Sequence, residues 1–221
     1  MWLLISIPMV LILTILVSSY LQKDEILEEG KGKINVTKII PKNLKNTIFL
    51  AVAFIFGITV FAMQYNHFVE YIQASKLTFL IMLLAPIAYI DFKSHKIPNI
   101  LVITGILARF VFYIIEMIVL NKKMLDILFS DIKGVLLGCG ILLLGSLITK
   151  NGVGMGDVKM YAVIAMFMGY SGTILSLIIS LFVCFIASII LLVTGKKTRK
   201  DTIPLAPFVY IGTFITIFFE N

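Results

Sequence analysis

The sequence predicts an all-α membrane protein, a polytopic bundle of about eight transmembrane helices with both termini on the extracytoplasmic side. Of its 221 residues, 60% are hydrophobic and 14% are charged, and the mean hydropathy is +1.05. Soluble domains are about half apolar and about one quarter charged. The apolar residues also gather in runs long enough to cross a bilayer, and basic residues concentrate in alternate loops.

Eight apolar segments are candidate spans. They are Trp2–Tyr20, Thr47–Met63, Leu77–Ile90, Asn99–Leu120, Gly134–Thr149, Val158–Tyr170, Gly172–Thr194 and Ile203–Phe219. We expect the first to be a retained span, because no basic residue precedes it and no small-residue cleavage site follows it. The sixth is short and is also compatible with one half of a longer hairpin with the seventh.

The spans are predicted to form one integral membrane domain over residues 1–221. Residues 1–20 form the first span, 21–46 a short cytoplasmic loop, and 47–219 the remaining spans. That loop is too short to have a core of its own. Cys139 and Cys184 lie singly in apolar stretches, which indicates neither a zinc site nor a disulfide framework.

Basic residues orient the predicted bundle. The loops after the first, third, fifth and seventh spans carry most of the lysines and arginines, while Lys122, Lys123 and Lys133 are among the few on the other side. The positive-inside rule places the first set in the cytoplasm. The net charge of +7 is explained by this topology, so no nucleic-acid binding is predicted.

Two aspartates stand at the ends of apolar segments. Asp91 follows Leu77–Ile90, and Asp157 ends Gly154-Met155-Gly156-Asp157 before another apolar run. Carboxylates near hydrocarbon are costly and are usually functional. An even number of spans separates the two, so both fall on the cytoplasmic side. Two carboxylates that meet can share a proton, the arrangement with which aspartic proteases hydrolyse peptide bonds.

The neighbours of Asp157 suggest how this end of the bundle is built. Gly154 and Gly156 permit positive φ and close backbone approach, so a bend that admits an extended peptide is expected here. Taken singly, Asp157 also suits the N-cap of a helix. Lys159, two residues after Asp157, is placed either to lower the pKa of a nearby carboxylate or to anchor the helix at the membrane interface.

Other polar residues have less specific settings. Pro98 suits the first position of the next helix, and His95 is expected to be solvated. Arg109 and Glu116 lie seven residues apart, about two helical turns, so they project from one face of a helix. A structural ion pair is the simpler interpretation of these two residues, and their role is left open.

Three motifs resemble those of a known family. Asp91 is followed by Lys96-Ile97-Pro98-Asn99, the glycine motif continues as Asp157-Val158-Lys159, and a third segment reads Ile203-Pro204-Leu205-Ala206-Pro207-Phe208. In this order they resemble the motifs of the type IV prepilin peptidases, membrane aspartyl proteases of the GxGD type. The resemblance covers roughly residues 77–219.

The resemblance implies that Asp91 and Asp157 are the catalytic pair of an aspartic endopeptidase. It implies type IV prepilins or pseudopilins as substrates, cut after a short basic leader at the cytoplasmic face of the bacterial plasma membrane. No metal ion or covalent intermediate is needed for such a reaction. The residues expected to shape the site are Gly154, Gly156, Lys159, Pro98, Asn99, Pro204 and Pro207.

One departure from the family pattern concerns cofactors. Many bacterial members carry a zinc-binding insert with paired CxxC motifs between the first two spans, and often methylate the new N-terminus with S-adenosylmethionine. Here that region is Gln22–Lys45, without cysteine. Zinc is therefore not expected, and whether the chain uses S-adenosylmethionine is left open.

Two alternative functions remain at this stage. The chain could process substrates of another pilin-like secretion, competence or adherence system. A small ion- or proton-coupled transporter would also use paired acids, but it favours acids near the bilayer midplane and an inverted repeat. Neither feature is evident in the sequence.

Overall fold

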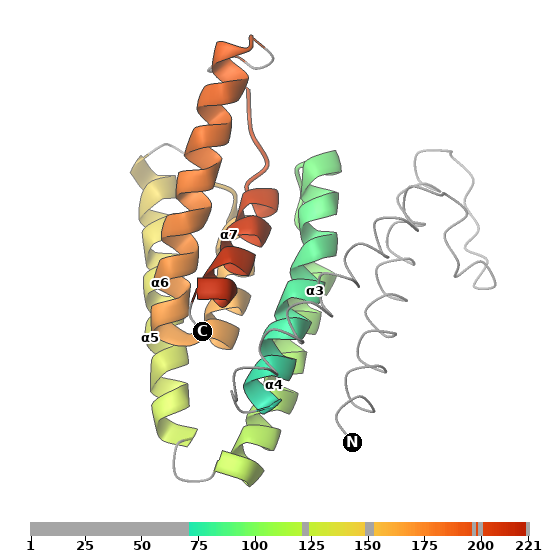
Figure 1. The fold of residues 1–221 in the computed structure, drawn as a ribbon, viewed down its shortest axis with the longest axis vertical. Coiled ribbons are helices and arrows are strands. Elements are labelled where there is room, and N and C mark those ends of the chain that lie inside the picture. The colour runs from blue at the N-terminus through green and yellow to red at the C-terminus, as the bar shows by residue number, and fades with distance from the viewer. Residues whose placement is uncertain (1–70, 121–123, 149–152, 196–197, 199–200, 220–221) are drawn as a thin grey trace, which may run out of the picture.

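The computed structural model describes residues 71–120, 124–148, 153–195, 198 and 201–219. These residues form five helices and no strand, in the order α3 (Tyr71–Ser94), α4 (Asn99–Leu120), α5 (Met124–Ile148), α6 (Met155–Val193) and α7 (Ala206–Phe219). The predicted all-helical architecture is confirmed for this part of the chain (Figure 1). The first two candidate spans, the loop between them and both termini lie outside the described residues.

Four of these helices are long and apolar enough to cross a membrane, namely α3, α4, α5 and α6, and α7 is shorter. The predicted bounds of α4 agree with the structure. The predicted bounds of two other helices, α3 and α5, were wrong for the same reason. Helix α3 continues through Ser94, so Asp91 lies inside it, and α5 begins ten residues before the predicted Gly134. In both cases the helix continues through polar residues that hydropathy places in a loop.

Helix α6 contains two helical segments. The chain breaks at Gly169, where φ is 68° and ψ is −165°. Gly138 of α5 faces both segments, since a Cβ added to it would lie 3.0 Å from Thr173 and 3.9 Å from Tyr161. The expected pairing of Val158–Tyr170 with the following span as a longer hairpin therefore describes α6 well.

The turn in α6 requires glycine at position 169. A positive φ is costly for residues with a side chain, and a Cβ there would also lie 2.6 Å from Oγ of Ser130. Because the two helices lie this close, the Ser130 hydroxyl accepts a hydrogen bond from the Tyr170 N–H at 3.0 Å. Helix α5 thus caps the start of the second segment.

The second segment of α6 is longer than the first by about ten residues, or roughly 15 Å along its axis. Figure 1 shows its end reaching well beyond α3 and α5. Apolar side chains such as Phe182, Phe185 and Ile190 are exposed on this part of α6. Exposed apolar surface of this kind fits contact with lipid chains.

Helix α3 is the most buried of the four long helices. It packs against α7 in antiparallel fashion, since Asp91 near its end contacts the start of α7 and Leu77 near its beginning clusters with Ile217. Helix α6 packs against both α5 and α7. The last turn of α3 and the first turns of α6 and α7 therefore meet at one end of the bundle (Figure 1).

The contact of α6 with α7 depends on a small residue at position 212. A Cβ on Gly212 would lie 2.7 Å from the backbone N and Cα of Ser180. We expect Gly212→Ala to push the helices apart and to lower the free energy of unfolding by about 1–3 kcal/mol. Thermal unfolding in detergent measures this loss.

Gly140 offers a matched control on α5, where an added Cβ has nothing within 4 Å. Gly140→Ala is expected to be neutral or stabilising by up to about 1 kcal/mol, because alanine is the better helix former. Equal stability of the two variants would contradict the close packing of α7 on α6.

Candidate active site

Asp91 lies in the last turn of α3 and is 5% exposed. The helix ends just beyond it, where His95 adopts φ of 52° and donates its backbone N–H to the Asp91 carbonyl at 2.8 Å. This is the usual left-handed termination of a helix, with histidine in a position that glycine more often takes. The His95 side chain is exposed, as the sequence predicted.

The Asp91 carboxylate contacts the start of α7. Its Oδ2 accepts a hydrogen bond of 3.0 Å from the backbone N–H of Ala206, the first residue of that helix. Pro204 and Pro207 flank this residue and are partly buried. The third sequence motif therefore packs against the first aspartate, a contact that the sequence analysis did not foresee.

Asp157 lies in the first turn of α6, where the N-cap is Gly154. Its backbone N–H donates to the Gly154 carbonyl at 3.0 Å. A carboxylate in the first turn of a helix suits the helix dipole. The alternative prediction, that Asp157 is itself the N-cap, was wrong, because the N-cap is Gly154, three residues earlier.

Gly154 and Gly156 lie where neighbouring atoms leave little room for a side chain. The backbone of Gly154 is extended, with φ of −69°, and not in the positive-φ region. A Cβ there would lie 3.1 Å from Oδ2 of Asp157, and a Cβ on Gly156 would lie 3.1 Å from Cβ of Ile97. Side chains at these positions would press on the carboxylate and on the loop that follows α3.

The two aspartates lie at the same end of the bundle. Helices α4 and α5 carry the chain across and back between them, as the even number of predicted spans requires (Figure 1). The carboxylates of Asp91 and Asp157 are close enough to interact electrostatically. Asp91 is buried and Asp157 is partly buried, so water screens this interaction less than it would at a surface.

The loop after α3 joins the two aspartate motifs. Pro98 is buried just before α4, and its carbonyl accepts the N–H groups of Leu101 and Val102. Pro98 was predicted to take the first helical position, but it stands one residue before it, because α4 begins at Asn99. The next residue, Asn99, accepts a hydrogen bond of 3.2 Å from Nζ of Lys159, and both side chains are exposed.

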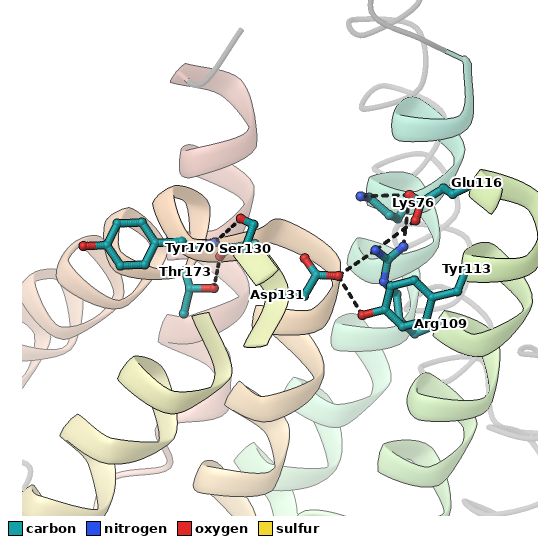
Figure 2. Close-up of polar contacts among 9 residues, drawn as sticks. Lys76, Arg109, Tyr113, Glu116, Ser130, Asp131, Tyr170 and Thr173 are labelled. Atoms are coloured by element: carbon teal, nitrogen blue, oxygen red, sulfur yellow. Dashed lines mark hydrogen bonds and ion pairs between the residues drawn. The ribbon is translucent and has the colours of Figure 1, made fainter. Parts of the chain in front are cut away.

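A second polar cluster lies away from the aspartates, and Figure 2 shows its members. The Arg109 guanidinium pairs with Glu116 at 3.1 Å and with Asp131 at 2.7 Å, and Lys76 pairs with Glu116 at 3.3 Å. The hydroxyl of Tyr113 donates to Asp131 at 2.7 Å. Lys76 precedes Asp91 by about four helical turns, roughly 22 Å along α3.

This cluster shows how the buried charge of Arg109 is paired. The structural ion pair with Glu116 is confirmed, and Arg109 is fully buried. The sequence analysis missed Asp131, because α5 was expected to begin only at Gly134. Asp131 has polar neighbours in the sequence, so it was taken for a loop residue. In the structure it lies inside α5 and is 4% exposed.

No group of three metal-ligating side chains that could hold a metal ion occurs within the described ranges. The candidate site there consists of two carboxylates, two helix N-termini and a loop. Such a set can hold a proton, bind water and donate backbone N–H groups.

Comparison with known proteins identifies the family. Residues 77–192 match the model of the type IV leader peptidase family, and the matched region contains both aspartates. No curated protein and no solved structure matches the chain. Because the matched region spans more than half of its length, the chain belongs to the type IV leader peptidase family, a family of proteases.

Proposed function

We propose that this protein removes the leader from type IV prepilins or pseudopilins, with Asp91 and Asp157 as its catalytic pair. The observation that carries the proposal is the position of these two carboxylates at one end of a helical bundle, near enough for the charge of Asp91 to act on Asp157. The match to a leader peptidase family supports the substrate class. The transporter alternative has no comparable support.

In the proposed reaction the two carboxylates share one proton, because two like charges that meet in a buried site do not easily both ionise. The ionised member takes a proton from water, and the protonated member polarises the scissile carbonyl. The roles then exchange as the amine leaves. This scheme uses neither a metal ion nor a cofactor.

We place the site on the cytoplasmic side of a bacterial plasma membrane, following the distribution of basic loop residues. The apolar end of α6 extends roughly 15 Å past the end that holds the aspartates, which favours a site sunk below the membrane surface. A substrate whose scissile bond precedes an apolar helix would reach such a depth. Nearby lysines such as Lys93 and Lys159 repel a basic leader, so backbone and apolar contacts would carry recognition.

The test uses the purified full-length protein in lipid vesicles with a peptide that carries a basic leader before an apolar helix. We expect cleavage at the junction, with a new N-terminus identified by mass spectrometry. A second arm adds S-adenosylmethionine, and a gain of one methyl group would assign methyltransferase activity. An intact peptide in the presence of folded protein would contradict the proposed function.

A further inference from the structure

The first turn of α7 has an unusual arrangement of backbone donors. Phe208 and Val209 donate their N–H groups to the Leu205 carbonyl at 3.0 and 3.1 Å, and Pro207 has no N–H to donate. The N–H of Ala206 is therefore the one donor of residues 206–209 that leaves the helix. It is directed to Asp91 at 3.0 Å.

Both partners of this hydrogen bond are buried, Ala206 being 1% and Asp91 5% exposed. Hydrogen bonds to a charged acceptor are roughly twice as strong as neutral ones. The helix N-terminus adds a partial positive charge beside the carboxylate. The contact links residues 115 positions apart, so it fixes the end of α3 against the start of α7.

We propose that the N-terminal amide of α7 is a positioning group for catalysis. By binding Oδ2 of Asp91, it orients this carboxylate toward Asp157 and leaves the second oxygen for the proton or the water. The inference rests on the proposed function, since it assigns a role within the same site. It also accounts for Pro207, which has no backbone N–H that could compete for the carboxylate.

A lactic acid ester at position 206 replaces the Ala206 N–H with an oxygen and adds no atoms. We expect kcat to fall about 10²-fold, the usual effect of misplacing a catalytic group by about 1 Å, with KM within about twofold and an unchanged melting temperature. Ala206→Pro also removes the donor, and proline is favoured at the first position of a helix. Its ring Cδ, however, would lie between the nitrogen and Oδ2 of Asp91, which are 3.0 Å apart, so its loss of kcat should be at least as large as that of the ester.

Ala206→Gly is the matched comparison, because it keeps the N–H and loses only a buried methyl group, so its kcat should fall far less than that of the ester variant. Wild-type kcat in the ester variant would overturn the inference, and so would an equal loss in Ala206→Gly. These comparisons require a wild-type protein that cleaves the peptide. Failure of the wild-type protein would instead contradict the proposed function.

Discussion

Asp91→Asn and Asp157→Asn should each abolish leader cleavage, lowering kcat by about 10⁴-fold, near the upper end of what acid–base groups contribute. Asparagine keeps the shape of the side chain and can still accept a hydrogen bond, so the amide side chain at position 91 can still bind the Ala206 N–H. It cannot take or give the proton that the proposed reaction requires. Initial rates with the purified variants in lipid vesicles, followed by mass spectrometry, measure the loss.

Asp126→Asn is the matched control for these substitutions. Asp126 is an exposed carboxylate in the first turn of α5, away from the end that holds the aspartate pair. We expect wild-type cleavage from this variant. Retained cleavage in either Asp91→Asn or Asp157→Asn would contradict the catalytic pair and leave the family membership untouched.

Several features of the fold and site were predictable because they follow from the number and order of apolar segments. Hydropathy gave the bounds of α4 correctly, and the parity of the spans placed Asp91 and Asp157 at one end of the bundle. The hairpin within α6 was also foreseen as an alternative. Each of these depends on the order of apolar and polar segments, which a single sequence contains.

The contacts between distant residues were not predictable in this way. Ala206 and Ile97 have no polar side chain, yet one donates its backbone N–H to Asp91 and the other packs on Gly156. Asp131 looked like a loop residue because hydropathy treats every carboxylate as solvated. A buried guanidinium at 2.7 Å reverses that preference, and only the packing of α4 against α5 brings the guanidinium there.

The buried cluster leads to the prediction with the largest effect on stability. Arg109→Met leaves Glu116 and Asp131 buried with Lys76 as the remaining cation of the cluster (Figure 2). Removing one partner from a buried ionic group costs about 3–5 kcal/mol, because the other charge stays desolvated. We expect a loss of this size in the free energy of unfolding, measured by equilibrium denaturation in detergent.

The double variant Arg109→Met/Asp131→Asn tests whether charge balance is the cause. It removes one cation and one anion together and leaves Lys76 paired with Glu116 at 3.3 Å, so it should be more stable than Arg109→Met alone. A double variant that is no more stable would show that packing of the guanidinium on Tyr113, 4.0 Å from the ring centre, matters more than charge. Because the cluster lies about four helical turns from Asp91 along α3, the folded fraction of each variant should cleave with wild-type kcat, whereas a catalytic role for Arg109 would lower it.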